Sequence, residues 1–515
     1  MATDASRQRL PPQVPYIIGN EGAERFSFYG MRNILTPFLV TSLLMYLPEA
    51  ERAGTAKDVF HTFVIGVYLF PLLGGWLADR FWGKYNTILW FSLLYCVGQG
   101  MLAVFDQNRT GFYAGLALIA FASGGIKPLV ASFVGDQFDK STKHLAKLVF
   151  DAFYWIINFG SFFASLLMPI FLRDFGPKVA FGVPGVLMGV ATLVFWLGRK
   201  HYVMIPPAPP SQDSILRVCR TALLAHAPGQ GRNGLLLAGF GALLSAVVLA
   251  YTAQLGIVIT FCLALVLLIG FGGGGAWLQL DRARGLHPDE AIEGVRAVLR
   301  LLLIFALVTP FWSLFDQKAS TWVLQAGYMT RPEWFHPAQM QALNPALVML
   351  LIPFNNLVLY PALRRRGYEM TGLRRMTTGM AAAGLSWVAA GVFQLVIDGG
   401  DPVSIAWQVL PYALLTFGEV LVSAGGLEFV YSQAPQSMKG IIMSLWYLAV
   451  TAGNVWVLVA NATVRNDAVL GAIGGTGLST DAFLMFFFAG FAFVAALVFG
   501  MYAKRYKEVD NYRSA

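Results

Sequence analysis

The sequence is poor in cysteine and in charged residues. Only three cysteines occur in 515 residues, and their spacing suits no metal ion, so we expect neither a disulfide framework nor a metal site at Cys96, Cys219 or Cys262. Charged residues make up 13% of the chain and hydrophobic residues 57%, whereas soluble domains usually carry roughly 25% charged residues. This composition is typical of a protein that crosses a membrane many times and argues against a soluble fold.

The motifs that usually mark an enzyme are also missing. The sequence has no nucleophile elbow and no HExxH pair. A glycine run at 272–275 lacks the Lys-Ser/Thr that follows in a phosphate-binding loop, so we interpret it as a place where helices pack closely. We therefore predict a protein that is not an enzyme, with no ATP site and no cofactor.

Apolar stretches of membrane-spanning length are abundant instead. A helix needs about 20 residues to cross the roughly 30 Å of hydrocarbon in a bilayer. The first fifteen residues lack the features of a signal peptide, so the first stretch is expected to stay as a span. Fourteen stretches qualify, at 16–47, 58–79, 84–106, 111–138, 145–172, 178–199, 235–252, 255–280, 292–328, 338–363, 372–398, 403–434, 438–464 and 480–503.

The spans group as six, two and six. A Pro-rich segment at 201–210 indicates a stiff linker, and 215–227 has the mixed character of a helix that lies on a surface. Two similar halves with the substrate held between them are typical of transporters built from repeats. We predict an N-terminal six-helix bundle, a linker with two inserted spans, and a C-terminal six-helix bundle, at 1–200, 201–285 and 286–515.

Basic residues gather in alternate loops, which favours one orientation of the chain. The net charge of +9 would suggest nucleic acid as a partner of a soluble protein, but between hydrophobic spans it records membrane orientation. We therefore expect no nucleic-acid binding. The alternation predicts that both termini lie in the cytoplasm.

Four ionisable side chains lie inside the first span. An ionised group at mid-bilayer costs at least ~2.5 to 3.5 kcal/mol, so such groups avoid lipid and face a bundle interior or a watery cavity. At 3.6 residues per turn they share one stripe of the helix with two aromatic rings. The stripe predicts a site along a path across the membrane, formed by Glu21, Glu24, Arg25, Phe28, Tyr29 and Arg32.

Other intramembrane charges offer partners for this stripe. Lys127 lies within the fourth span, and Glu419 lies within the 403–434 span with the opposite charge. If the two halves face each other, these two residues are natural partners. A static ion pair that fixes helix packing is the alternative. Since desolvation of a buried pair can exceed its Coulomb gain, a switching role accounts better for such pairs.

Four sequence motifs resemble known ones. The run GGWLADRFWGK at 74–84 resembles the signature loop of the major facilitator superfamily. ExxERFxFYG at 21–30, GGIKPLVASFVGDQF at 124–138 and GLEFVYSQAP at 426–435 resemble motifs of the proton-coupled oligopeptide transporter (POT) family within it, with Val430 in place of a serine. The resemblance covers nearly the whole chain, including the two inserted helices of bacterial members.

This resemblance implies an all-α fold of two six-helix bundles with two extra membrane helices between them. It also implies a symporter that imports di- and tripeptides with protons by alternating access, with the proton gradient as its energy source. We expect such a protein in the cell inner membrane, in contact with lipid, with the monomer as its functional unit. The alternatives are a same-fold transporter of another solute, such as nitrate or a peptidomimetic drug, and a nutrient sensor that does not transport.

The resemblance and the chemistry of peptides together suggest roles for individual residues. A peptide is a zwitterion, so Glu419 suits its ammonium end and basic side chains suit its carboxylate end. The family pattern places Lys127 opposite Glu419, and Asp316 near Arg32 and His61 at an outer gate; His61 could equally be an interface histidine. The residues for proton coupling are Glu21, Glu24, Arg25, His61 and Asp316. Those for substrate binding are Arg25, Tyr29, Arg32, Tyr68, Lys127, Tyr154, Asn158, Trp312, Asn344, Glu419, Ser423 and Trp446. Those for gating are Arg32, Asp316, Lys127 and Glu419.

Overall fold

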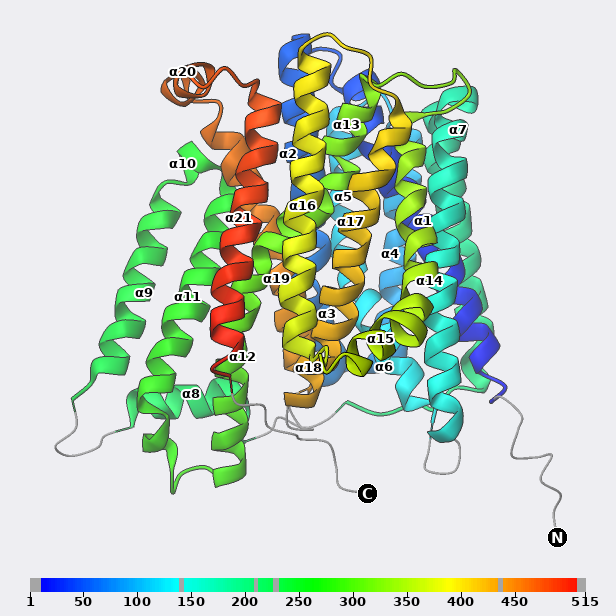
Figure 1. The fold of residues 1–515 in the computed structure, drawn as a ribbon. Coiled ribbons are helices and arrows are strands. Elements are labelled where there is room, and N and C mark those ends of the chain that lie inside the picture. Colours follow the sequence, from blue (N-terminus) through cyan, green and yellow to red (C-terminus); the bar gives the residue numbers. More distant parts are fainter. Residues whose placement is uncertain (1–10, 139–142, 208–211, 226–230, 434–438, 507–515) are drawn as a thin grey trace. The chain divides into compact units, whose positions relative to one another are not determined.

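The computed structural model is helical almost throughout (Figure 1). It describes residues 11–138, 143–207, 212–225, 231–433 and 439–506. Within these ranges no strand forms, and backbone bridges outside helices are limited to two isolated pairs, Arg284 with His287 and Thr330 with Ser404. The predicted all-α fold is therefore confirmed. The chain termini, for which a cytoplasmic location is predicted, fall outside the described residues, as do Ala434 and Pro435 of the last motif.

The chain forms two compact units, each assembled from separate stretches. Unit 1 comprises Met1–Ala208, Asp316–Glu369 and Ala389–Phe417, and unit 2 comprises Pro209–Phe315, Met370–Val388 and Gly418–Ala515. Each unit has its own packed interior. The domain boundaries predicted at residues 200 and 285 stay predictions.

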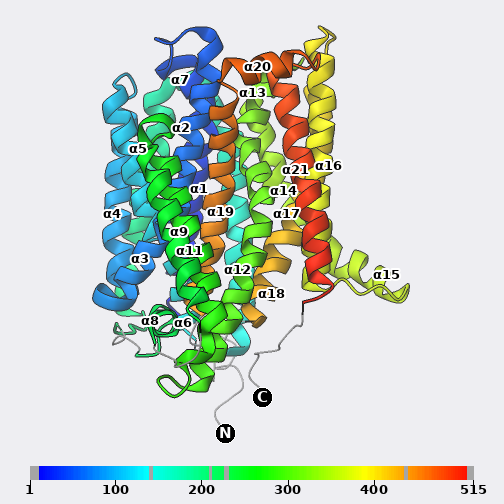
Figure 2. The same cartoon turned by 90° about the vertical axis from the view of Figure 1, so that its left-hand side faces the viewer.

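Unit 1 contains the first six predicted spans. Helix α1 packs along α7, α4 packs against both α5 and α7, and α2 packs against α5 (Figure 2). The ring of Phe38 lies 5.0 Å from those of Phe112 and Phe181, so aromatic packing ties α1, α5 and α7 together. The helices that lie wholly in unit 1 are α1 (Val14–Phe38), α2 (Glu49–Leu69), α3 (Pro71–Leu77), α4 (Gly83–Val104), α5 (Arg109–Gly124), α6 (Lys127–Asp136), α7 (Lys143–Leu197), α13 (Thr321–Gly327), α14 (Leu343–Phe354) and α15 (Tyr360–Arg365).

Unit 2 contains the inserted helices and much of the second half of the chain. Its members are α8 (Ile215–Leu224), α9 (Asn233–Ala250), α10 (Thr252–Leu255), α11 (Ile257–Gln279), α18 (Gly425–Gln433), α19 (Lys439–Thr463), α20 (Asp467–Gly474) and α21 (Thr480–Ala503). Three further helices contain a boundary between the units: α12 (Asp289–Asp316), α16 (Gly372–Asp398) and α17 (Val409–Glu419).

The inserted helices α9 and α11 lie side by side (Figure 1), and α11 also contacts α19. A side chain at Gly275 would clash with the carbonyl of Gly234, so the absence of a side chain lets the two backbones meet. This confirms the close packing predicted for the glycine run. The short helix α8 forms where a surface-lying helix was predicted, with Val218 and Ala222 buried and Leu216 exposed.

The predicted number of spans agrees with the structure. In the described part of the chain, eleven helical stretches are long and apolar enough to cross a membrane. Two of them, Glu49–Val104 and Ala152–Lys200, each cover two predicted spans, and the others match one predicted span each. The first predicted span corresponds to α1, which carries four charged side chains and is not among the eleven. All fourteen predicted spans are therefore helical.

Several spans are interrupted, and sequence periodicity did not predict where. The fourth span breaks between α5 and α6, so that Lys127 is the first residue of a new helix. Helix α7 bends at Gly176, whose φ of 80° is in the left-handed region that favours glycine. Short π-helical turns, which often mark functional sites, occur at Leu39–Leu43, Ala78–Trp82, Asn355–Leu359 and Val420–Ala424.

Two adjacent glycines of the signature loop, Gly74 and Gly75, test the contact between α3 and the end of α5 in unit 1. A side chain at Gly74 would clash with the backbone carbonyl of Gly124, whereas a side chain at Gly75 would meet nothing within 4 Å. We expect Gly74→Ala to destabilise the protein by about 1–3 kcal/mol, as overpacking usually does. Gly75→Ala is the matched control and should leave stability unchanged or slightly raise it, because alanine favours helix. Thermal unfolding of the purified variants measures both. Equal unfolding midpoints for the two variants would contradict the contact.

Candidate functional site

The charged run of α1 is buried in unit 1. Glu21 and Glu24 are 1% and 0% exposed, and the side chain of Arg25 is 13% exposed. Arg25 Nε donates a hydrogen bond to Glu21 Oε1 at 2.6 Å. The same nitrogen lies 3.2 Å from Glu24 Oε2, close enough for an ion pair, although neither oxygen of Glu24 accepts a hydrogen bond from the described residues. The Arg25 guanidinium therefore donates a short hydrogen bond to Glu21 and forms only a longer ion pair with Glu24.

Lys127 lies near this run, at the start of α6. Its side chain is buried, and its Nζ lies 3.2 Å from the ring centre of Phe28 and 5.1 Å from that of Tyr68. No carboxylate in the described part of unit 1 forms an ion pair with it. Aromatic faces stabilise a desolvated cation by about 2 kcal/mol or more, but they carry no net negative charge to balance it. The position is also the positive end of a helix dipole, which favours an anion.

Arg32 and Asp316 form the second charged group of unit 1. Arg32 Nη2 donates to Asp316 Oδ1 at 2.7 Å, and the two side chains are 7% and 3% exposed. The guanidinium also lies over the ring of Phe60, with its carbon 5.2 Å from the ring centre. The pair joins α1 to the last residue of α12, residues that are 284 positions apart in sequence. The two residues that the family pattern brings together therefore meet.

His61, on α2, contacts the turn that follows Asp316. It is fully buried, and its Nε2 lies 2.9 Å from the Ser320 hydroxyl, which belongs to the turn after α12. In the same turn, Lys318 Nζ donates to Asn344 Oδ1 at 2.8 Å, and Asn344 Nδ2 donates to the Thr416 hydroxyl at 3.0 Å. Sequence reasoning missed Lys318, Ser320 and Thr416. Their nearness to Asp316 in the run FDQKAS is the only signal that could have found the first two.

The remaining candidates of unit 1 differ in how accessible they are. Tyr29 and Tyr68 are half-buried, and Tyr154 is exposed. Asn158 is buried, and its amide donates to the Tyr154 carbonyl one turn earlier in α7 at 3.0 Å. One donor of that amide is therefore used within its own helix.

Four candidates belong to unit 2. The rings of Trp312 and Trp446 are buried and pack edge to face, with 5.9 Å between centres, and the buried Trp312 indole nitrogen has no hydrogen-bond partner among the described residues. Glu419 is half-buried at the end of α17. Ser423, also half-buried, lies in the π-helical turn that follows. The predicted pairing of Glu419 with Lys127 joins residues of different units and stays a prediction.

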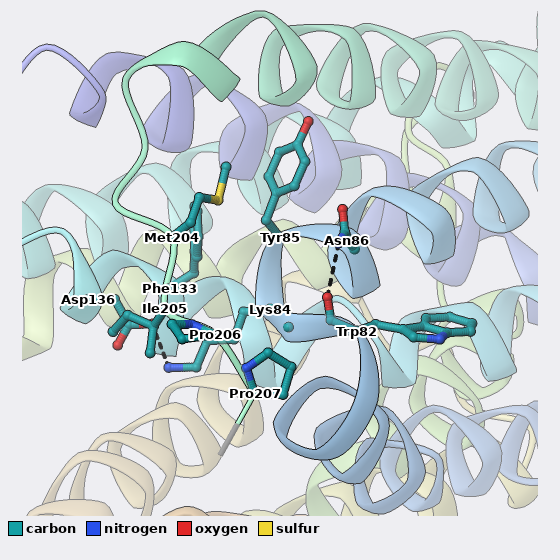
Figure 3. Close-up of a pocket in the computed structure, with 11 residues that line it drawn as sticks. Trp82, Lys84, Tyr85, Asn86, Phe133, Asp136, Met204, Ile205, Pro206 and Pro207 are labelled. Atoms are coloured by element: carbon teal, nitrogen blue, oxygen red, sulfur yellow. Dashed lines mark hydrogen bonds and ion pairs between the residues drawn. The ribbon is translucent and has the colours of Figure 1, made fainter. Parts of the chain in front are cut away.

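The signature loop lines a small cavity in unit 1 (Figure 3). Lys84 Nζ donates to Asp136 Oδ2 at 2.6 Å, which ties the start of α4 to the end of α6. The cavity of about 390 Å³ is closed on one side by the chain segment from Met204 to Pro207. Sequence reasoning did not single out Asp136, although it stands within one of the quoted motifs.

The arrangement of these groups can support ion pairing and the binding of protons. Among the residues that the structure describes, no three His, Cys, Asp or Glu side chains are placed to hold a metal ion. Unit 1 instead holds buried acids and bases close together. Such groups change partners or protonation state when a charged ligand or a proton arrives.

A double-mutant cycle tests the coupling of Arg32 and Asp316. Removal of one partner of a buried pair leaves a charge without its counter-charge, so each change to alanine should destabilise the protein by about 3–5 kcal/mol. The double variant should be more stable than the sum of the two losses implies. Thermal unfolding of the purified variants measures this. The exposed pair Arg173–Asp174, also 2.6 Å long, is the control, and Asp174→Ala should change stability little. Additive effects at Arg32 and Asp316 would show that the pair is not coupled.

The chain is similar to known proteins over most of its length. The family model described as the POT family matches residues 85–234 and 279–474. Peptide transporter 3 of Caenorhabditis elegans is 34% identical over 406 residues, which cover 75% of this chain and 51% of the relative. The chain thus spans about half the length of the curated relatives it matches.

Two solved structures are similar to the whole fold. One is the crystal structure of an auto-inhibited POT family peptide transporter, with 66% identity and a TM-score of 0.95 over 98% of this chain and 99% of that one. The other is the POT family transporter PepTSo, with 63% identity and a TM-score of 0.95 over 98% and 100%. We conclude that the chain is a multi-pass membrane protein with the major facilitator fold and belongs to the POT family.

Proposed function

We propose that this protein is a symporter that imports di- and tripeptides with protons by alternating access. The relatives named above as peptide transporters support the substrate class. The observation that carries the proposal is the state of Lys127, a buried ammonium that rests on aromatic rings and has no ion pair within the described part of unit 1.

Lys127 supports a subsite for the carboxylate of the peptide. The ammonium and the N-terminus of α6 both favour an anion at the same place. A carboxylate there would give Lys127 the counter-charge that the rings of Phe28 and Tyr68 do not supply. Every peptide has this carboxylate, so the subsite would accept peptides of any sequence.

Unit 2 supplies chemistry for the rest of the peptide in this proposal. The half-buried Glu419 would bind the ammonium end, beside the π-helical turn that contains Ser423. The edge-to-face pair of Trp312 and Trp446 offers apolar surface for peptide side chains. Polar groups of fixed position would orient the backbone, and aromatic surface would tolerate different side chains.

Proton coupling in this proposal uses the two buried groups of unit 1. A proton from outside would enter at His61 and Asp316 and weaken the contact of Asp316 with Arg32. It would then reach Glu21 or Glu24 beside Arg25. Glu21, Glu24 and Arg25 together carry two negative charges and one positive charge, so one proton would neutralise this group and lower the cost of its burial.

Transport follows when the two events are linked. A peptide at Lys127 and Glu419 and a proton at α1 would together weaken the contacts that hold one state, and the two halves would then rock to open the site on the other side. We further propose that the protein lies in the cell inner membrane with both termini in the cytoplasm. The monomer would be the functional unit, and the proton gradient would supply the energy without a cofactor.

Uptake of a labelled dipeptide into proteoliposomes tests the function. An inward proton gradient should raise the initial rate and drive accumulation above equilibrium, because each peptide enters with protons. Unlabelled di- and tripeptides should compete, whereas free amino acids and nitrate should not. The same rate of dipeptide uptake with and without the proton gradient would contradict proton coupling. Competition by nitrate, with none by peptides, would indicate the same-fold transporter of another solute.

Lys127→Ala tests the carboxylate subsite. The loss of a charge-assisted contact worth about 1.5–3 kcal/mol should weaken dipeptide binding by roughly tenfold to a hundredfold, with and without a proton gradient. Binding of a labelled dipeptide to the purified protein measures this. Lys178→Ala, which removes an exposed lysine of α7, is the control and should bind as the wild type does. Unchanged affinity in Lys127→Ala would remove this residue from the site.

A further inference from the structure

The short helix α8 of unit 2 is fixed beside the ends of two membrane-spanning helices. Gln279, the last residue of α11, is buried, and its Nε2 donates to the Ala222 carbonyl of α8 at 3.2 Å. Its Oε1 accepts a hydrogen bond from the Leu235 amide, in the first turn of α9, at 2.9 Å. Since α9 and α11 are both long and apolar enough to cross a membrane, α8 lies at the membrane boundary. Figure 1 shows α8 running across the direction of these spans, near the lower end of α11.

A histidine forms a second attachment of α8. His287 Nδ1 lies 2.8 Å from Asp213 Oδ1, just before α8, and His287 Nε2 lies 2.9 Å from the Thr221 hydroxyl within it. Helix α8 also packs against the turn Leu280–Ala283, which follows α11. Val218 is buried on this side of the helix. These contacts fix one face of α8 on the protein and set the direction of the other.

The opposite face of α8 is not covered by the chain. Leu216 and Leu224 are 82% and 57% exposed, and Arg217 and Arg220 are also exposed. At 3.6 residues per turn these four side chains share one side of the helix, and we call them the α8 exposed face. Leucine beside arginine on a helix at a membrane boundary is typical of a helix that lies among lipid headgroups. Arginine can bury its stem there and keep its charged end in the headgroup layer.

The two arginines of the α8 exposed face form no ion pair with a residue that the structure describes, and α8 itself contains no acid. Other arginines of unit 2 differ in this respect. Arg284 and Arg296 bind acids of the segment that follows α11, which are Asp281, Asp289 and Glu293. Arg217 and Arg220 thus leave two positive charges for a partner outside the chain. A phosphate group suits them, because a guanidinium can donate two parallel hydrogen bonds to it.

We propose that the α8 exposed face binds acidic phospholipids of the leaflet at which α8 lies. Arg217 and Arg220 pair with the lipid phosphates, and Leu216 and Leu224 contact the upper part of the acyl chains. Attraction of each basic side chain to acidic headgroups adds to the burial of the leucines. A zwitterionic lipid fits less well, because its own ammonium group balances its phosphate. This binding would anchor the inserted segment to the membrane surface, and it does not depend on the proposed transport.

Hydrogen–deuterium exchange of the full-length protein in nanodiscs tests the proposal at α8 itself. The wild type is compared in phosphatidylcholine alone and in phosphatidylcholine mixed with phosphatidylglycerol. Backbone amides of Ile215–Leu224 should exchange more slowly in the mixture, by up to about thirtyfold, since each arginine near an acidic surface contributes roughly fivefold in affinity. Helix α20 (Asp467–Gly474), which has no basic side chain, is the internal reference and should exchange equally in both lipids.

Two double variants separate charge from fold. Arg217→Gln combined with Arg220→Gln should abolish the difference between the two lipids. Arg217→Lys combined with Arg220→Lys keeps both charges and should retain most of it. Thermal unfolding in phosphatidylcholine should be the same for both variants and the wild type, because substitution of exposed side chains usually changes stability little.

Four results would overturn the proposal. The first is equal exchange of α8 in both lipids for the wild type. The second is a lipid-dependent difference that persists in the glutamine double variant, because the acidic lipid would then act elsewhere. The third is slow exchange produced by inorganic phosphate in phosphatidylcholine nanodiscs, which would assign the arginines to a free anion. The fourth is slow exchange that requires two protein copies in one nanodisc, which would assign the face to a second copy of the chain.

Discussion

The structure depends on one constraint, that an ionised side chain within a membrane protein must have a partner. Helix α1 carries four such groups, and each is placed by this requirement. Arg25 binds Glu21 and lies near Glu24, and Arg32 binds Asp316 from the end of α12. Packing along α7 keeps α1 buried. The charged groups of α1 determine which residues of other helices lie next to it.

Two residues meet this requirement only in part, Glu24 on α1 and Lys127 at the start of α6. Lys127 has aromatic rings in place of a counter-charge, and Glu24 has an ion-pair neighbour but no hydrogen bond from the described residues. A buried charge without a full partner favours the binding of a ligand of opposite charge. A buried carboxylate in this state also favours the binding of a proton. The proposed function uses Lys127 for the peptide carboxylate, and Glu21 or Glu24 for the proton. In this proposal the two are coupled by their nearness, because Lys127 lies over the ring of Phe28, one turn of α1 from Glu24.

The sequence was sufficient for the spans and for the charged stripe, because hydropathy and helical period are local properties. It also indicated the Arg32–Asp316 contact through the family motifs. Local properties did not predict the break at Gly125 and Ile126 that makes Lys127 the first residue of a helix. Nor did they find the partners Asp136 and Ser320, which depend on which helices meet.

Coupling of peptide and proton movement is the central claim, and proton flux driven by peptide tests it most directly. Proteoliposomes with a pH-sensitive dye inside, equal pH on both sides and the membrane potential clamped at zero would receive an inward gradient of a dipeptide. The interior should become acidic as the peptide enters, and the same peptide with an amidated C-terminus should acidify it far less. Entry of the dipeptide without acidification would contradict the account.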